Sequence, residues 1–366
     1  MAPGLTPIAF DDLPGFADDD HLAAFLAYRR CAIALNDGLA ATRPAQPASA
    51  EMLDIARVAV REAIDDRQSA RQFFERWFRP FLVDHGNGVA PGFVTGYYEP
   101  VIAGSLVRTS EFASPVLGRP ADLVTFAQGE SREGFAGLTA AQRMANGALR
   151  PYPERAAIEA TESQRQPILW LRDRVEVFLS QVQGSASVDL VDGERVRLAY
   201  DGRNGHPYTS IGRTLIETGE IAESEMSLEC LKQWLRANGL APGDKARALM
   251  QSNRSYVFFR LETEFDANDG PTGGAGVALT ALRSIAIDRA HWPYGAPFWT
   301  DADLPWQGDA PTPFRRLMIA QDTGSAILGP ARADIFFGQG DDAGLRAGAI
   351  RHPARFTVLL PAETSL

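Results

Sequence analysis

The stretch RRLMIAQDTGSAILGPARADIFFGQG, from Arg315 to Gly340, carries the strongest pattern in this chain of 366 residues. Its apolar run Leu317 to Ala320 predicts a short buried strand, and Ala333 to Phe337 predicts a second strand that stops at Gly338. The glycines and the proline between these runs predict turns. The stretch therefore predicts two strands joined by a loop, with an aspartate in or beside each strand.

These two aspartates are Asp322 and Asp334. A carboxylate that points inward between Ala333 and Ile335 loses hydration, which disfavours its charged form and raises its pKa. Proteins make a general acid in this way. In the alternative interpretation, Asp322 caps its own turn through backbone N–H groups and Asp334 points outward to water. The spacing alone leaves both interpretations open.

Composition sets limits on the class of protein. The chain is long enough for two or three domains, and hydrophobic residues at 45% with charged residues at 22% are ordinary for a soluble globular protein. The formal net charge of −10 argues against a nucleic-acid partner, because neutralising phosphates requires basic surface. An anionic substrate would need local arginines.

Cysteine count and hydropathy exclude further classes. Cys31 and Cys230 are the two cysteines, so we expect neither a disulfide scaffold nor a thiolate metal site, although one disulfide between them stays open. No apolar run approaches the length of a membrane span. The N-terminal residues lack the basic start and apolar core of a signal peptide.

The N-terminal part of the chain predicts helices. Residues His21 to Leu35 have helical apolar spacing after three aspartates, and a second helix is predicted from about Glu51 to Phe81. From Gly92 onward, short apolar runs alternate with turn residues, which is typical of strands. Later, Pro167 to Val182 predicts a helix, and Val188 to Tyr200 predicts a hairpin.

Polar residues gather in several of these segments. Glu99 follows two tyrosines at the end of a predicted strand, an aromatic and acidic setting that suits a sugar ring but is also common in plain structure. The segment from Gly202 to Gly212 holds Asn204, His206 and Tyr208, with enough donors and acceptors to line a polar groove. A lone histidine there is more often a turn residue, and no second histidine lies at metal-ligand spacing.

Five separated motifs, in order along the chain, together resemble one known family. They are GFVTGYYEPV from Gly92, VQGSA from Val182, GRNGHPYTSIGRTLIETGEI from Gly202, NRSYVFF from Asn253 and AQDTGSAILGPARADIFFGQG from Ala320. The resemblance is to the membrane-bound lytic murein transglycosylase A family, and it extends from about Phe73 to Leu360. It implies a mainly β fold with flanking helices. In that family a double-psi β-barrel domain and a smaller inserted β-domain leave a groove for a glycan strand.

The resemblance also implies a domain organisation and site residues. We expect residues 1–104 to form the N-terminal helices and the first part of the barrel domain, 105–200 the inserted domain, and 201–366 the rest of the barrel domain. Its aspartate-containing 3D motif matches Asp322 and Asp334, with Asp334 at the position of the catalytic acid/base and Asp322 in support. The resemblance places Glu99, Gln183, Tyr208 and Arg283 in motifs that match the groove lining. The residues expected to bind substrate are these four with Thr95, Tyr98, Asn204 and His206.

The implied reaction needs one titrating carboxylate. A glycoside hydrolase uses two, whereas a lytic transglycosylase uses the 6-hydroxyl of N-acetylmuramic acid (MurNAc) as nucleophile and leaves a 1,6-anhydro product. No metal or organic cofactor is implied. The expected partners are peptidoglycan glycan strands and other cell-wall enzymes, and we expect a monomer. Although neither a signal nor a lipid-bearing cysteine begins this sequence, the resemblance implies the periplasm or outer membrane of a Gram-negative bacterium.

Two alternative functions are weighed against this one. A peptidoglycan-binding protein without activity would have no need of a desolvated acid, so both aspartates argue against it. The residues Asp322-Thr323-Gly324-Ser325 also spell the core of an aspartic protease motif. Such an enzyme shares one proton between two carboxylates from two such motifs, and the sequence contains no second copy.

Overall fold

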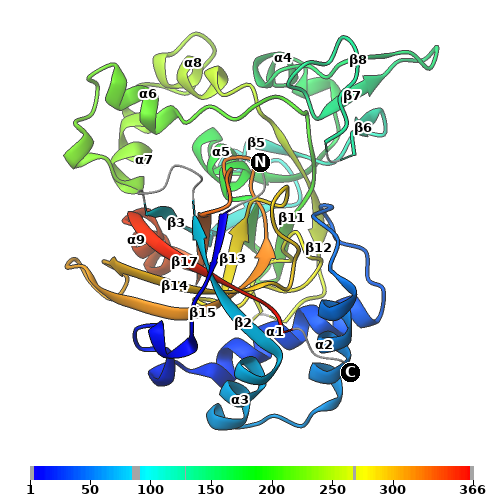
Figure 1. The fold of residues 1–366 in the computed structure, drawn as a ribbon. Helices are drawn as coiled ribbons and strands as arrows, with labels where there is room; N and C mark the ends of the chain where they lie inside the picture. Colours follow the sequence, from blue (N-terminus) through cyan, green and yellow to red (C-terminus); the bar gives the residue numbers. More distant parts are fainter. Residues whose placement is uncertain (1–3, 85–90, 128, 267–268, 363–366) are drawn as a thin grey trace. The chain divides into compact units, whose positions relative to one another are not determined.

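The computed structural model describes residues 4–84, 91–127, 129–266 and 269–362 (Figure 1). Its contacts divide the chain into two compact units. The first comprises Met1–Tyr98, Ala267–Gly338 and Leu345–Leu366, and the second comprises Glu99–Asp266 and Gln339–Gly344. The mainly β class with flanking helices is confirmed.

The first unit contains an eight-stranded sheet. Its strands are β1 (Gly4–Pro7), β2 (Phe78–Asp84), β3 (Gly92–Glu99), β13 (Ser284–Ile287), β14 (Pro297–Leu304), β15 (Thr312–Asp322), β16 (Arg332–Gln339) and β17 (Arg351–Pro361). Six of them close into a barrel in the order β17-β14-β15-β13-β16-β3, because β3 also pairs with β17. The long strand β17 uses its first residues for β3 and its last residues for β2.

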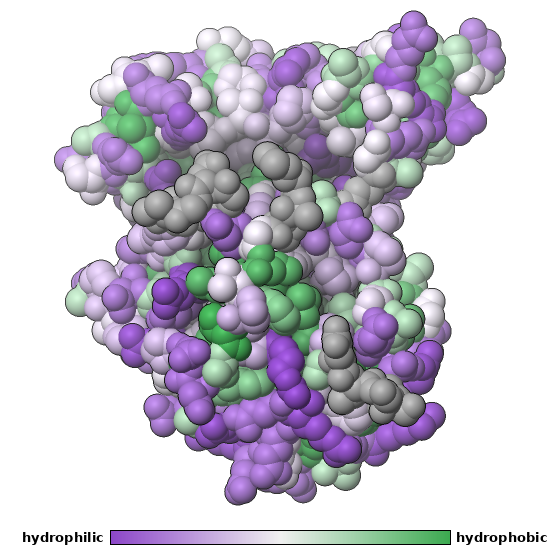
Figure 2. Space-filling model, in the orientation of Figure 1, coloured by the Kyte–Doolittle hydropathy of each residue, from purple (hydrophilic) through white to green (hydrophobic). Residues whose placement is uncertain are grey.

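Helices at the N-terminal end complete the first unit. They are α1 (His21–Asn36), α2 (Ala50–Arg61) and α3 (Arg67–Trp77), preceded by short 3-10 turns η1 (Phe10–Asp12) and η2 (Phe16–Asp18). Asp20 caps α1 by accepting the N–H of Ala23 at 3.3 Å. Phe25 of α1 packs edge-on against Phe73 of α3, with ring centroids 5.0 Å apart. The surface over α3 is largely hydrophilic (Figure 2), so this helix is amphipathic.

The predicted helix from 51 to 81 is wrong as a single element. It divides into α2 and α3, and the chain becomes strand β2 at Phe78. Asp66 starts the new helix by accepting the N–H of Ser69 at 2.9 Å, and Pro80 has no N–H with which to continue it. The aromatic side chains Phe73 and Phe74 of α3 are buried.

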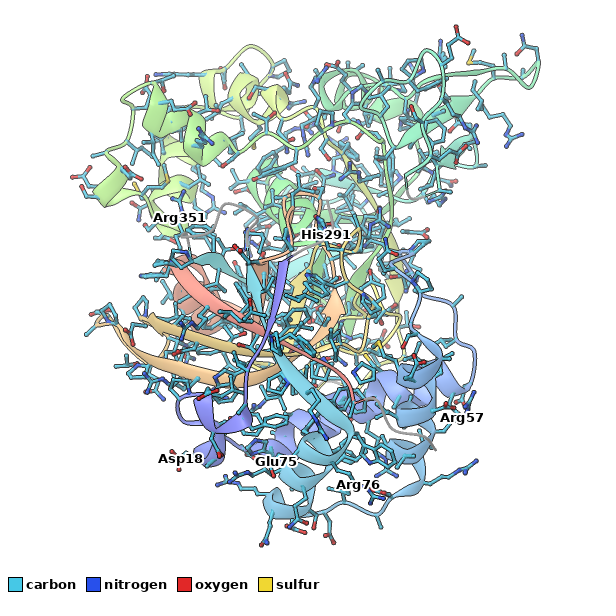
Figure 3. The ribbon with its side chains drawn as sticks, in the orientation of Figure 1. Asp18, Arg57, Glu75, Arg76, His291 and Arg351 are labelled. Carbon is cyan, nitrogen blue, oxygen red and sulfur yellow. The ribbon has the colours of Figure 1, made fainter. Side chains whose placement is uncertain are left out.

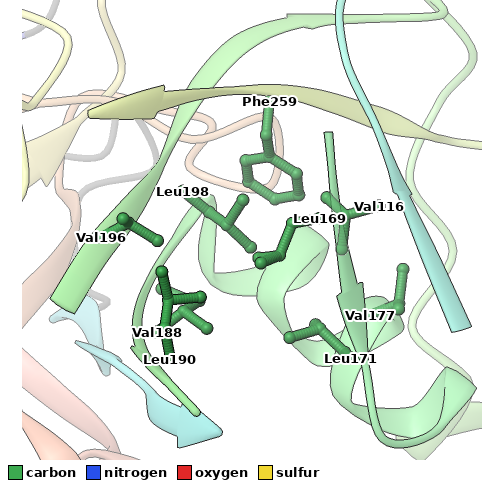
Figure 4. Close-up of a cluster of buried hydrophobic side chains, with 10 residues drawn as sticks. Val116, Leu169, Leu171, Val177, Val188, Leu190, Val196, Leu198 and Phe259 are labelled. Carbon is green, nitrogen blue, oxygen red and sulfur yellow. The ribbon is translucent and has the colours of Figure 1, made fainter. Parts of the chain in front are cut away.

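The second unit has a six-stranded sheet in the order β12-β11-β10-β4-β9-β5 and a three-stranded sheet, β6-β7-β8. Its strands are β4 (Val101–Ser105), β5 (Ser114–Leu117), β6 (Leu123–Thr125), β7 (Ala140–Arg143), β8 (Leu149–Pro151), β9 (Pro167–Leu171), β10 (Ser185–Leu190), β11 (Arg195–Arg203) and β12 (Val257–Glu262). A bridge between Gly118 and Phe259 joins the two edges of the larger sheet. Apolar side chains of that sheet, among them Leu169, Leu198 and Phe259, form the core seen in Figure 4.

The helices of this unit are α4 (Arg155–Ala160), α5 (Arg174–Gln183), α6 (Ile211–Glu217), α7 (Leu228–Ala237) and α8 (Lys245–Ser252), with 3-10 turns η3 (Glu162–Gln164) and η4 (Glu223–Glu225). Helix α9 (Gly340–Gly348) begins in residues of the second unit and ends in the first. The predicted helix Pro167 to Val182 is wrong in its first part, where Pro167–Leu171 is strand β9, paired with both β4 and β5. The helix begins only after Asp173, which caps it.

Two other expectations can be compared with the structure. The hairpin from Val188 to Tyr200 is confirmed, with β10 and β11 paired from Asp189 and Arg195 outward. The sequence placed the end of the insertion at residue 200, whereas residues 201–266 pack with the second unit. The reason is that β12 pairs along β11 and so extends the same sheet.

Candidate active site

Strand register brings the two aspartates of the opening stretch together. Strand β13 lies between β15 and β16, parallel to the first and antiparallel to the second. Its residue Ala286 pairs with Asp322, the last residue of β15, and also with Asp334 of β16. Directly paired residues point to the same face of a sheet, so the carboxylates flank the small Ala286 side chain.

Asp334 accepts a hydrogen bond from Thr95, which in turn accepts one from Arg332. The hydroxyl of Thr95 on β3 donates to Asp334 Oδ1 at 2.5 Å, and Arg332 donates from Nη2 to Thr95 Oγ1 at 2.7 Å. The guanidinium of Arg332 lies over the ring of Phe93, 5.5 Å from its centroid. Phe93 and Thr95 are two apart on β3, as Arg332 and Asp334 are on β16, so each pair shares a face.

This environment makes Asp334 a weak acid. Part of the residue is accessible to solvent, but protein atoms crowd the carboxyl. Burial raises its pKa from 3.8 to about 6; the charge of Arg332 and the Thr95 hydrogen bond oppose the rise, and the charge of Asp322 adds to it. The direction is the one expected from the sequence. Asp334 therefore carries a proton at mildly acid pH and can both give and take one.

Asp322 is buried and is held by hydrogen-bond donors from other segments. Tyr97 donates its hydroxyl to Oδ2 at 3.0 Å, and the backbone N–H of Gly274 donates to Oδ1 at 2.8 Å. Arg43 places Nη2 at 3.8 Å from Oδ1. The hydrogen bonds to Asp322 thus come from Tyr97 and Gly274, and not from its own turn as the alternative interpretation proposed.

Tyr97 links the strand β3 to this acid. Its ring packs against Phe336, with centroids 5.4 Å apart, and its burial and the charges of Asp322 and Asp334 hold its pKa well above the usual value. It therefore stays a donor. Tyr97 was not among the residues expected at the site, although its spacing of two from Thr95 on a predicted strand was a usable signal.

Arg43 reaches the site from the segment that joins α1 to α2. Its Nη1 donates to the carbonyl of Thr323 at 2.6 Å, and its backbone N–H donates to the carbonyl of Gly274 at 3.2 Å. The neighbouring Thr42 donates its hydroxyl to the carbonyl of Gly273 at 2.9 Å. Nothing in the sequence around Arg43 indicated this position, because its partners lie more than 200 residues away.

Arg283 and Glu99, both expected to bind substrate, each form a buried ion pair instead. Arg283 donates through Nη1 and Nη2 to both carboxylate oxygens of Asp19, at 2.7 and 2.8 Å, and to the carbonyl of Leu317. In the second unit, Arg197 donates to both oxygens of Glu99 at 2.8 and 3.3 Å. Burial raises the pKa of Glu99, opposed by the Arg197 charge. We therefore do not include either residue among the proposed substrate contacts.

The polar cluster from 202 to 212 is also occupied by structural contacts. Asn204 is fully buried, donates to the carbonyls of Pro153 and Arg254 and accepts from the N–H of Tyr256. His206 is buried with Nε2 at 2.7 Å from the carbonyl of Tyr152. These contacts position the loop.

The other expected substrate residues differ in accessibility. Tyr98 is buried, whereas Gln183 and Tyr208 are half-buried. Burial raises the pKa of Tyr208, opposed by a hydrogen bond with Ser210 and by the charge of Arg155. Thr95 contacts a proposed catalytic group directly. Gln183 and Tyr208 remain predictions.

The described ranges contain no group of three or more His, Cys, Asp or Glu that could hold a metal ion. None of their helices is long and apolar enough to cross a membrane. Cys31 is buried, Cys230 is half-buried, and both are free thiols.

The fold and site together define a class: a mainly β protein whose closed six-stranded barrel holds one weakly acidic and one hydrogen-bonded aspartate side by side. Two models of known protein families match this chain. Residues 93–260 match the MltA specific insert domain and residues 283–360 match the 3D domain.

Individual relatives agree with these matches. Membrane-bound lytic murein transglycosylase A of Escherichia coli K12 is 30% identical over 302 residues, which are 80% of this chain and 72% of that protein. A membrane-bound lytic murein transglycosylase from Agrobacterium tumefaciens is 34% identical, with a TM-score of 0.86 over 98% of each chain. Escherichia coli MltA, solved with bound chitohexaose, is 25% identical, with a TM-score of 0.65 over 98% of this chain and 92% of that one.

The chain belongs to the membrane-bound lytic murein transglycosylase A family.

Proposed function

We propose that this protein is a lytic transglycosylase that cleaves the β-1,4 bond between MurNAc and N-acetylglucosamine in peptidoglycan and leaves a 1,6-anhydro-MurNAc end. The observation that carries the proposal is the crowded carboxyl of Asp334, with its pKa raised to about 6, next to a second acid held by donors. The names of the relatives and the chitohexaose bound to one of them support a glycan substrate.

The reaction uses Asp334 twice. Protonated Asp334 gives its proton to the glycosidic oxygen as the bond from the MurNAc C1 carbon breaks. The 6-hydroxyl of the same MurNAc then forms a bond to C1, and Asp334, now a carboxylate, takes the hydroxyl proton. Atoms and charge balance without water, and Asp334 returns to its starting form.

Asp322 has a different task in this scheme. Tyr97 and the backbone N–H of Gly274 donate hydrogen bonds to its oxygens, and Arg43 adds a positive charge nearby. A fixed negative charge near the reacting carbon stabilises the oxocarbenium-like transition state. It also raises the pKa of Asp334, which keeps the acid protonated.

We also propose a location. The relatives are described as membrane-bound murein enzymes, and peptidoglycan lies in the bacterial envelope. Attachment to the periplasmic side of the outer membrane would place the protein at this substrate.

Product analysis tests the function directly. Purified peptidoglycan is digested with the protein, and the released muropeptides are analysed by mass spectrometry. We expect MurNAc ends lighter than hydrolytic ends by the mass of one water. Reducing ends would instead show a hydrolase. Release of no fragments, with retained pelleting on peptidoglycan, would show a binding protein.

The pH dependence of turnover gives a second test. Because the acid must be protonated to cleave, we expect kcat/KM to fall as the pH rises through about 6, the pKa of Asp334. The measurement is the initial rate of fragment release between mildly acid and mildly alkaline pH, with folding monitored by circular dichroism. A rate that stays constant across this range would contradict the role of Asp334.

Removing the charge of Asp322 should have a smaller effect than removing the acid. We expect Asp322→Asn to lower kcat by on the order of 10²-fold, through loss of transition-state stabilisation. Because Asp322 raises the pKa of Asp334, the fall in rate should also move to lower pH in this variant. Wild-type activity and an unchanged pH profile in Asp322→Asn would show that the charge has no part in the reaction.

A further inference from the structure

We propose that Arg332, acting through Thr95, decides which carboxyl oxygen of Asp334 carries the catalytic proton, and that this oxygen is Oδ2. The inference rests on the proposed function, since it concerns the acid of that reaction. It assigns positioning roles to Arg332 and Thr95. The Arg332 guanidinium, the Thr95 hydroxyl and the Asp334 carboxyl are joined by two successive hydrogen bonds.

The donor and the acceptor of each hydrogen bond follow from what each group can donate. A guanidinium has N–H donors and no acceptor, so Arg332 Nη2 must donate to Thr95 Oγ1, 2.7 Å away. A threonine hydroxyl has one proton and accepts through its lone pairs. With a lone pair of Oγ1 used by Arg332, the hydroxyl proton points to Asp334 Oδ1 at 2.5 Å.

The consequence for Asp334 is an unequal pair of oxygens. Oδ1 accepts the Thr95 proton in a short contact. If Oδ1 itself carried a proton, two protons would compete in that contact, and the threonine would have to rotate away from its acceptor. The proton therefore resides on Oδ2, and the same oxygen later takes the proton of the 6-hydroxyl.

Arg332 is itself held in place from two sides. Its Nη1 donates to the carbonyl of Ala333, and its guanidinium lies over the Phe93 ring, which is on the same face of β3 as Thr95. The guanidinium reaches the hydroxyl of Thr95, and its charge acts on Asp334 from a distance. Arg332 is therefore a positioning residue.

Among the described residues, the charges that act on Asp334 are those of Arg332 on its own strand and Asp322 at the end of β15. Tyr97 on β3 is a titratable neighbour, Arg351 of β17 pairs with Thr95, and β13 contributes the uncharged Ala286. Arg43 faces Asp322. Of these, Arg332 donates a hydrogen bond to the Thr95 hydroxyl.

The test compares Thr95→Val, Thr95→Ser and Arg332→Met with the wild type, using kcat/KM against pH. Valine keeps the shape of threonine and removes the hydroxyl, whereas serine keeps the hydroxyl. We expect about a 10-fold fall in kcat for Thr95→Val and for Arg332→Met, as for one lost hydrogen bond to a charged group. In both variants the fall in rate should move to higher pH, because each loses an interaction that favours the carboxylate.

Two further results distinguish positioning from a general loss of structure. Thr95→Ser should restore the wild-type pH profile. The double variant Thr95→Val/Arg332→Met should lose little more kcat than Thr95→Val alone, because the arginine positions the proton through the hydroxyl. Its fall in rate should move further towards high pH than in Thr95→Val, because the charge of Arg332 also acts directly on Asp334. Arg57→Met is the matched control, since Arg57 lies on α2, where Figure 3 labels it, and pairs with Asp54 away from this site.

The outcomes separate this inference from the proposed function. An unmoved pH profile in Thr95→Val, or fully additive losses in the double variant, would overturn the positioning role while anhydro products from the wild type still supported the function. Absence of anhydro products from the wild type would overturn the proposed function itself.

Discussion

Replacing Asp334 by asparagine is expected to lower kcat by about 10⁴-fold, the upper part of the range for one general acid–base group. Asparagine keeps the shape of aspartate but has no proton to give to the glycosidic oxygen and cannot take one from the 6-hydroxyl. Because the same residue acts in both transfers, its loss affects both. Thr95 can still donate to the amide oxygen, so the fold around the site should be retained.

The measurement is the rate of release of anhydro-muropeptides, together with pelleting on insoluble peptidoglycan and thermal unfolding. The expected pattern is lost turnover with unchanged pelleting and unfolding temperature. Asp301→Asn is a matched control, since Asp301 lies on barrel strand β14 and pairs with the partly exposed Arg315. Loss of glycan binding and of stability in Asp334→Asn would give Asp334 a structural role instead.

Replacing Arg283 by methionine is expected to reduce the free energy of unfolding by about 3–5 kcal/mol, as is typical when one partner of a buried ion pair is removed. The side chains of Arg283 and Asp19 are 3% and 4% exposed, so Asp19 would be left without its charge partner and away from water. Asp19 also accepts the N–H of Leu317 at 2.8 Å, so the pair ties the N-terminal segment to β15. Burial raises the pKa of Asp19, but the hydrogen bond and charge of Arg283 outweigh it and keep that pKa low.

Urea unfolding of Arg283→Met measures this loss, and the double variant Asp19→Asn/Arg283→Met should recover part of it because no unpaired charge remains. The control is Arg315→Met, which removes a partly exposed pair and should cost less than about 1 kcal/mol. A stable Arg283→Met protein with a raised KM would show that Arg283 binds substrate, as the sequence analysis expected.

The two aspartates proposed to carry the reaction could be predicted from the sequence because both lie inside one continuous motif. Asp322 and Asp334 lie twelve residues apart in a pattern whose strand register then brings them together at Ala286. Tyr97 and Arg43 could not be paired with Asp322, because they lie far from it in the sequence and only the closed barrel brings these segments together. Arg332 was within the motif, but its role depends on Thr95 of a distant strand.

The errors in secondary structure have a common physical origin. Short apolar runs such as Pro167–Leu171 do not distinguish a buried strand from part of a helix. In both misassigned segments an aspartate, Asp66 or Asp173, caps the true helix start. These caps were a local signal that could have placed the boundaries correctly.

The charged residues expected in the groove show a second limit of prediction from a single sequence. Glu99 and Arg283 stand in apolar segments, and a charge there indicates either a ligand or a partner elsewhere in the chain. Both have such partners in the structure, Arg197 and Asp19. A single sequence does not show which distant positions pair. A charge that binds a ligand and a charge in a buried ion pair therefore cannot be distinguished from the sequence.

The closure of the barrel by β3 and β17 has a consequence for the time at which this protein becomes active. Thr95 and Asp334 are separated by 239 residues, and Tyr97 and Asp322 by 225. At about 5–20 residues per second, a ribosome needs on the order of 10 s or more to make the second half of each pair. Strand β17, which must still pair with β3 and β14, is made later again. A nascent chain therefore cannot complete its acid site until strand β17 has been made.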